Sequence, residues 1–112
     1  MEAFQQERLA RNEVFFRSLN ERIADAVDAH SADGHVYDFV CECSNPTCLE
    51  RVHLTAADYE AVRADPKTFV LAPGHDRESI EKIVQPGFDH VIVEKLGAAG
   101  AVAAASDPRA QA

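Results

Sequence analysis

The sequence predicts an α+β fold with a long N-terminal helix, a small and mostly antiparallel sheet of hairpins, and one short helix. Three observations predict it: an apolar stripe with helical spacing in the first thirty residues, short apolar segments separated by turn residues after residue 36, and three cysteines within residues 41–48. With 112 residues, of which 46% are apolar and 27% charged, the chain has the size and composition of one globular domain. We place this domain at residues 1–96.

Residues 2–29 are expected to form the long helix, so that residues 1–30 precede a sheet region at 36–96. Apolar residues recur in this segment at intervals of three and four, which places their side chains on one helix face. These residues are Phe16, Leu19, Ile23 and Val27. No Pro or Gly interrupts the segment, and Gly34 stands close to where a C-terminal cap is expected.

A hairpin is predicted next, with all the cysteines in its loop. Residues 37–41 have the apolar character of a strand, and residues 51–54 alternate polar and apolar side chains as a half-buried strand does. Between them, the pair Asn45-Pro46 is typical of a turn, because Pro fixes φ and Asn accepts turn geometry.

A short helix is expected after this hairpin. Thr55 followed by Asp58 resembles a capping box, and the helix should end before Pro66, because Pro disfavours helical backbone in the residue that precedes it. Residues 68–71 then have the composition of another strand, which we expect in the same sheet as the cysteine hairpin.

The last structured part is predicted to be a second hairpin, formed by residues 80–84 and 90–95 around a turn at 85–89. Residues 79–85 are also compatible with a turn or two of helix. From residue 97 to 112 the chain consists mainly of small residues without periodicity, and we expect a disordered tail there.

The three cysteines have the pattern Cys41-x-Cys43-x4-Cys48. An odd number of thiols leaves one without a disulfide partner, and structural zinc sites take four cysteine and histidine ligands in a tetrahedron. Because side chains two residues apart share a face of a strand, a bent strand end can direct Cys41 and Cys43 at one ion. The cluster therefore predicts a zinc site that needs a fourth ligand.

Two histidines are the main candidates for the fourth ligand. His75 follows Pro73-Gly74 in a loop that can turn its imidazole toward the cysteines, and it is our first choice. His53 lies only five residues after Cys48, but the strand alternation directs it to solvent, so it is second. The remaining histidines have no local argument in their favour: His30, His35 and His90.

The motif string around these residues resembles a family of small uncharacterised proteins of high-GC Gram-positive bacteria. The resemblance rests on FVCEC, a third cysteine five positions later, and the string Phe69-Val70-x-x-Pro73-Gly74-His75, and it spans residues 14–95. It implies a metal site of three cysteines and one histidine, at Cys41, Cys43, Cys48 and His75. It implies no established activity.

Charge and motifs exclude several classes of function. The chain has 11 basic and 19 acidic residues, a net charge of −8, which disfavours binding to nucleic acid and to anionic membrane surfaces. We find no secretory leader and no apolar run that could span a membrane, which favours a cytoplasmic protein. Glu42 lies between two candidate ligands, but no known catalytic motif surrounds it, so a solvated Glu is the simpler interpretation and an enzyme is not expected.

These observations favour a zinc-binding regulatory or adaptor protein in signalling or transcription control. A zinc-thiolate redox switch is one alternative, and a metal-dependent enzyme is a weaker one. A helix of roughly 28 residues is about 42 Å long, which exceeds the span of short strands. We therefore expect the first half of the helix to overhang the sheet and to bind a partner or a second copy through residues 4–16.

Overall fold

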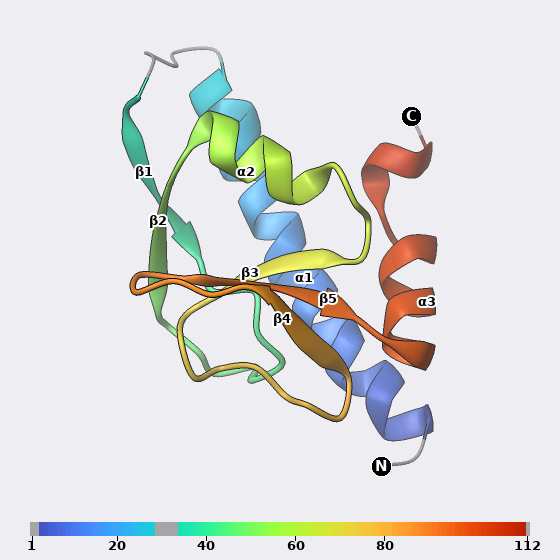
Figure 1. Ribbon diagram of the computed structural model, residues 1–112. Helices are drawn as coiled ribbons and strands as arrows, with labels where there is room; N and C mark the ends of the chain where they lie inside the picture. The colour runs from blue at the N-terminus through green and yellow to red at the C-terminus, as the bar shows by residue number, and fades with distance from the viewer. Residues whose placement is uncertain (1–2, 29–33, 112) are drawn as a thin grey trace.

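The computed structural model describes residues 3–28 and 34–111 (Figure 1) and confirms the α+β class. The elements in chain order are α1 (Ala3–Asp28), β1 (Val36–Val40), β2 (Arg51–Thr55), α2 (Ala56–Arg63), β3 (Thr68–Leu71), β4 (Glu81–Gln85), β5 (Val91–Lys95), α3 (Gly97–Ala105) and the 3-10 helix η1 (Pro108–Gln111). Both predicted hairpins form, and the long helix extends over nearly all of its predicted range.

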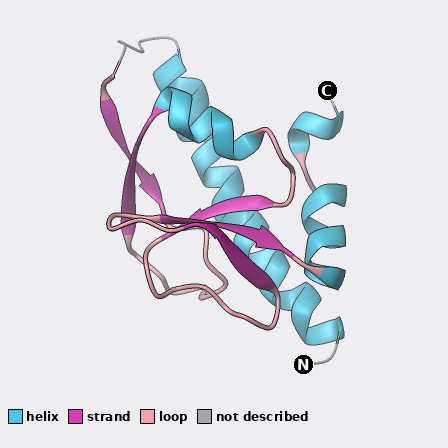
Figure 2. Cartoon of the chain, in the orientation of Figure 1, coloured by secondary structure: helices cyan, strands magenta, loops and turns pink. Residues whose placement is uncertain are grey.

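The strands form two antiparallel sheets rather than one, as Figure 2 shows. The hairpin β1–β2 stands alone, and β5 lies between β3 and β4 in a three-stranded sheet. The expectation that β3 would share a sheet with the cysteine hairpin is therefore wrong. After Val40 the chain leaves the strand direction, and Glu42 alone reaches β3, where its N–H donates to the carbonyl of Val70 over 2.8 Å.

Helix α2 begins and ends where the sequence predicted. The hydroxyl of Thr55 accepts a hydrogen bond from the N–H of Asp58, over 3.0 Å, which satisfies one of the free amides of the first turn. The helix ends at Arg63, before Pro66. Residues 81–85 form the strand β4, so the helical alternative for residues 79–85 is excluded.

The main core lies between α1, α2 and the two sheets. Its centre is aromatic: the rings of Phe39 and Tyr59 stack with centroids 4.6 Å apart, and both side chains are fully buried. Phe69 is also fully buried, and the charged ends of Arg17 and Lys95 lie over its ring at 4.7 and 4.9 Å from the centroid. Cys41 and Cys43 belong to this same buried cluster, so the cysteine loop is attached to the core.

The expected disordered tail is wrong, because residues 97–111 form α3 and η1. Small residues let α3 pack closely on the N-terminal half of α1: Ala99 and Ala103 are fully buried, and Ala99 forms an apolar cluster with Ala10 and Ile80 (Figure 1). The alanines that looked like a solvated tail are interface residues. Their periodicity is weak because the whole helix is apolar.

The same packing removes much of the predicted overhang of α1. Ala10, Glu13 and Arg17 are buried, and Leu9 packs against the α3 cluster. On the described part of α1, the large apolar side chain left in solvent is Phe15, which is 58% exposed. The side chain of Phe4 lies outside the described residues, as does His30 altogether.

Buried charges join α1 to the second sheet and to the C-terminal segment. Lys95 on β5 donates to both Glu13 on α1 and Glu81 on β4, and all three side chains are excluded from water. A second group, around the buried Arg63 of α2, links residues of α1, α2 and the C-terminal segment. Its other members are Glu21, Glu60, Asp107 and Arg109.

None of the described helices is long and apolar enough to cross a membrane.

Candidate metal centre

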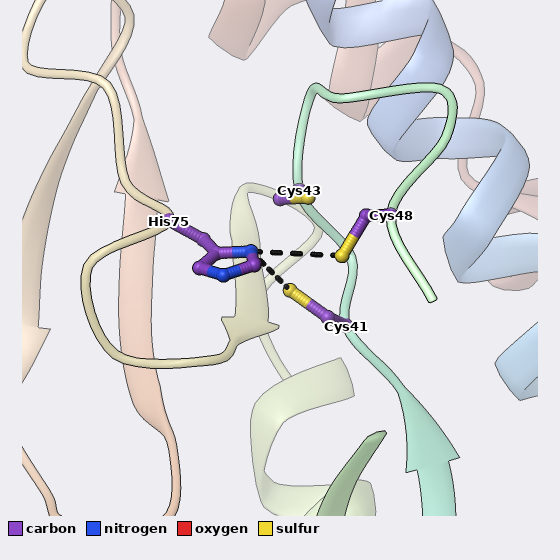
Figure 3. Close-up of side chains that lie close together, drawn as sticks. All are labelled: Cys41, Cys43, Cys48 and His75. Carbon is purple, nitrogen blue, oxygen red and sulfur yellow. Dashed lines mark hydrogen bonds between the residues drawn. The ribbon is translucent and has the colours of Figure 1, made fainter. Parts of the chain in front are cut away.

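Four side chains from two loops converge on one point, as Figure 3 shows. They are Cys41, Cys43, Cys48 and His75, the set that the sequence predicted. Every pair of their ligand atoms lies within 4.8 Å, and the three cysteines are free thiols. The arrangement can hold one metal ion.

The loop of the first hairpin brings the three sulfurs together. The N–H of Cys41 donates to the carbonyl of Glu50 over 3.1 Å, which continues the β1–β2 pairing past the last strand residue. At the far end, Asn45 caps a tight turn: its side-chain oxygen accepts the N–H of Thr47, and its carbonyl accepts the N–H of Cys48. The turn predicted from Asn45-Pro46 thus returns the chain so that Cys48 faces Cys41.

A second turn, at the end of β3, delivers the imidazole. The N–H of His75 donates to the carbonyl of Ala72 over 3.2 Å, and Gly74 has φ +85°. A positive φ at this turn position is typical of a type II turn and strongly favours glycine. The sequence Pro73-Gly74 therefore fixes the geometry that points His75 toward the hairpin loop.

The distances within the group fit a tetrahedral ion. Nδ1 of His75 is 3.6 Å from the sulfur of Cys41 and 3.6 Å from the sulfur of Cys48. On a tetrahedral zinc ion, bonds of about 2.3 Å to sulfur and 2.0–2.1 Å to nitrogen separate these two ligand atoms by about 3.5–3.6 Å. The two nitrogen–sulfur edges thus already have the length that one shared ion requires.

Backbone amides around the site are placed to support thiolates. Each sulfur accepts one backbone N–H: Cys41 from Ala72 at 3.1 Å, and the other two from residues of the hairpin loop. The hydrogen bond from Cys41 lowers the pKa of Cys43 to about 5, whereas the same contact and burial raise the pKa of Cys41. Burial and these hydrogen bonds thus favour a thiolate at Cys43 over a thiolate at Cys41.

Glu42, between two of the ligands, is fully buried rather than solvated as expected. One carboxylate oxygen accepts hydrogen bonds from Asn20 at 2.8 Å and from the hydroxyl of Tyr59 at 2.9 Å, and the other accepts the N–H of Val70 at 3.0 Å. Burial raises the pKa of this carboxyl, and these three donors oppose the rise. Because Glu42 holds α1, α2 and β3 at once, it fixes the backbone between Cys41 and Cys43.

Asn20 is the supporting residue that sequence reasoning missed. From α1, its side chain donates to the carbonyl of Val40 and accepts the N–H of Val40, each at 2.8 Å, in addition to its bond to Glu42. This pair of bonds gives the end of β1 the partner that a neighbouring strand would supply. The available signal was a polar amide next to the apolar stripe of the helix, where a fully buried Asn needs hydrogen-bond partners.

The second choice for the fourth ligand, His53, does not approach the cysteines. It is exposed on β2, with Nδ1 2.7 Å from Asp89 and Nε2 3.3 Å from Asp38. The hydrogen bond to Asp89 raises the pKa of His53. The ring of His35 packs at a tilt against Tyr37, and His90 contacts Asp89, so neither joins the group.

The chain has no significant match among protein families, among curated proteins or among solved structures. The resemblance drawn from its motifs stays a prediction, and the function has to be argued from the site.

Proposed function

We propose that the protein binds one zinc ion through Cys41, Cys43, Cys48 and His75, and that the ion is structural. The observation that carries this proposal is the convergence of the four ligand atoms with nitrogen–sulfur separations of 3.6 Å. Three soft thiolates and one imidazole form a ligand set typical of structural zinc. Zinc would keep the three sulfurs ionised and would join the β1–β2 loop to the turn after β3.

A structural role is favoured over a catalytic one. Four protein ligands complete a tetrahedral shell, whereas a catalytic zinc keeps a position for water or substrate. Cys41 and Cys43 are each 1% exposed, and the nearest carboxylate in sequence, Glu42, is held by donors from three elements on the side of the core. Asp76, beside His75, lines an open pocket with Cys43, but four protein ligands would leave the ion no position for water or substrate.

We propose that the zinc-stabilised fold has a regulatory or adaptor role in signalling or transcription control, through contact with another protein. The chain is small, carries a net charge of −8, and presents apolar side chains at separate points of its surface. Phe15 on α1 is exposed, and so are Ile83 and Phe88 on the β4–β5 hairpin. Exposed aromatic and aliphatic side chains support contact with a protein partner or a second copy, and Phe15 lies within the segment 4–16 predicted for this contact.

The redox switch stays the second candidate because the three free thiols lie within 4.8 Å of one another. The low pKa of Cys43, about 5, would make its sulfur a thiolate and a nucleophile whenever the ion is absent. Oxidation of two closely placed thiols to a disulfide would then prevent zinc from returning. Mild peroxide that releases zinc within minutes from the loaded protein would favour the switch, and retention of zinc would favour the structural role.

The metal is tested by elemental analysis of protein purified without added metal. We expect one zinc per chain, and loss of that zinc in Cys41→Ser, Cys43→Ser and Cys48→Ser. His75→Ala should weaken zinc binding strongly, while His53→Ala, a matched substitution of an exposed histidine outside the group, should not. Full zinc content in a triple cysteine variant would contradict the proposal.

A further inference from the structure

A cavity on the other side of the cysteine loop has the composition of a binding site. It has a volume of about 500 Å³, within the range of sites for small ligands, and lies between the N-terminal half of α1 and the two ligand-bearing loops. Its walls are formed by Gln5, Arg8, Leu9, Asn12, Ser44, Pro46 and Arg77. Two of these residues are arginines, and none is a carboxylate.

The two arginines bring positive charge to this cavity although the chain is strongly acidic. The sequence has 19 acidic and 11 basic residues. Even so, no carboxylate of the described residues lies within ion-pair distance of Arg8 or Arg77. By contrast, Arg63, Lys95 and Arg109 are each held by at least two carboxylates. The positive charge in this cavity is thus left without a protein counter-charge.

Arg77 is oriented by the cysteine loop. Its Nε donates to the hydroxyl of Ser44 over 2.8 Å, and Ser44 is itself buried next to Cys43. The described residues give the two terminal nitrogens of Arg77 no other partner, so they are free for a ligand. A guanidinium held at Nε with its terminal nitrogens free is suited to an oxyanion, which it binds through two parallel hydrogen bonds.

The other walls define the rest of the ligand. Gln5 and Asn12 supply amide groups, and the amide of Asn12 also donates to the carbonyl of Cys43 at 3.4 Å. Leu9 and Pro46 supply apolar surface. A cavity that combines two cations, two amides and an apolar wall fits a small molecule with one oxyanion group on an apolar body.

We propose that this cavity binds a small organic oxyanion, a carboxylate or a phosphate monoester, between Arg8 and Arg77. This goes beyond the proposed zinc site and does not depend on it. The ligand would contact Ser44, which follows Cys43 directly, and Arg77, which is two residues after His75. It would therefore lie against both loops that carry the proposed metal ligands.

The test uses the full chain as purified and three probes that share one ring: phenyl phosphate, benzoate and phenol. Amide chemical shifts are followed by NMR during titration. We expect saturable binding of phenyl phosphate, benzoate or both, with the largest shifts at Leu9, Asn12 and Ser44. The stronger of the two anions identifies the oxyanion class. Phenol, which lacks the oxyanion, should not bind in the same range.

Two variants and one control assign the binding to the arginines. Arg8→Gln and Arg77→Gln should each weaken the better anion by about tenfold or more, the effect of losing one strong charged contact. Arg22→Gln removes the same charge from an exposed position on the same helix and should leave affinity unchanged. Because Arg8 is exposed, its substitution should not disturb folding, and zinc content is measured for both variants.

Three outcomes would overturn the proposal. The first is that neither anion saturates at millimolar concentration. The second is equal binding by wild type and Arg8→Gln. The third is phenol binding as tightly as the anions, which would make the cavity merely apolar.

Discussion

The cysteine loops and the contact between α1 and the β3–β5–β4 sheet close the same small fold by opposite means. In the first region, four neutral or anionic ligand groups converge, and a cation from outside the chain would complete them. In the second, Lys95 is the chain's own cation, buried between Glu13 and Glu81. Under the proposed function, the first region would depend on metal supply, whereas the second depends only on folding.

The two regions also differ in how fully their polar atoms are satisfied. Each sulfur has a backbone donor, and Glu42 behind them has three hydrogen-bond donors. In the ion cluster, Oε1 of Glu13 is buried without a partner. A buried carboxyl group that is incompletely bonded carries a desolvation cost, which offsets part of the stability that the cluster contributes.

The largest effect is expected from removing the proposed metal. Structural zinc contributes on the order of 10 kcal/mol in small metal-folded peptides, comparable with the net stability of a whole domain. A strong chelator, or Cys41→Ser, should therefore unfold β1, β2 and the turn at His75. Hydrogen exchange followed by NMR should show protection lost there first, before the α1–α3 interface.

The control for this experiment is Thr47→Ser, a conservative change in the same loop that leaves all four ligands in place. It should keep both zinc and thermal midpoint. An apo protein with an unchanged midpoint would show that the site does not stabilise the fold.

The second effect is expected from Lys95→Met, which leaves the buried carboxyl groups of Glu13 and Glu81 without their cation. Breaking a buried pair in this way costs about 3–5 kcal/mol. Urea unfolding of the variant should show this loss at unchanged zinc content. Lys82→Met is the matched control, since Lys82 is exposed on the adjacent strand and lies 3.7 Å from Glu94.

A combined variant sharpens the comparison. Replacing all three members, as Glu13→Leu, Glu81→Met and Lys95→Met, should recover most of the lost stability, because apolar side chains need no counter-charge. If the triple variant is as unstable as Lys95→Met alone, the cluster stabilises the fold in its own right. No such replacement should rescue the cysteine site.

The contrast explains which parts the sequence could predict. Three of the four candidate ligands lie within eight residues, and the fourth follows a Pro-Gly turn signal, so local patterns were enough to indicate all four. The ion cluster draws Glu13, Glu81 and Lys95 from elements that are far apart in sequence. On a helix, Glu13 looks like any solvated charge, and only tertiary packing shows that it is buried.

The same limit accounts for the errors in the fold. Residues 97–105 have almost no amphipathic pattern because α3 consists of small apolar residues. Its helicity depends on packing against α1 and β5, and a short stretch of sequence does not show this tertiary contact. The separation into two sheets likewise depends on Asn20 and Glu42, whose side chains take the hydrogen-bonding role of a missing strand.

A third, smaller effect is the pH dependence of stability that Glu13 gives to the ion cluster. Burial raises the pKa of Glu13 to about 9, Lys95 opposes the rise, and Glu81 adds to it. A carboxyl with a raised folded-state pKa stabilises the fold fully below its unfolded value, and this contribution is lost as pH rises through the folded value. The free energy of unfolding should therefore decline between about pH 4.5 and pH 9, because in this range the folded state binds up to one more proton than the unfolded state.

Urea unfolding over this range measures the decline. Glu13→Gln keeps the shape of the side chain but cannot ionise, so its stability should be nearly independent of pH in this range. An equal slope in wild type and variant would assign the pH dependence to other groups.

The smallest effect is expected at a surface contact that joins the two sheets, between His53 of β2 and Asp89 in the β4–β5 turn. Asp89 accepts both the backbone N–H and Nδ1 of His53, each at 2.7 Å. Burial raises the pKa of Asp89, but the hydrogen bonds from His53 and His90 outweigh it and lower the pKa to about 2. The contact raises the pKa of His53.

The two shifts define the pH window of this contact. The raised pKa of His53 stabilises the fold at pH values below the pKa of the unfolded-state His, and this contribution is lost as pH rises through the folded-state pKa. The lowered pKa of Asp89 stabilises the fold above about pH 3.8, and this contribution is lost as pH falls toward 2. Asp89→Asn keeps an oxygen for the backbone N–H but removes the charge. NMR titration should show the pKa of His53 falling toward its ordinary value, with the thermal midpoint lowered only between these limits and by less than in Lys95→Met. Asp25→Asn, on the exposed face of α1, should leave the titration of His53 unchanged, and a raised pKa that persists in Asp89→Asn would assign the shift to Asp38 instead.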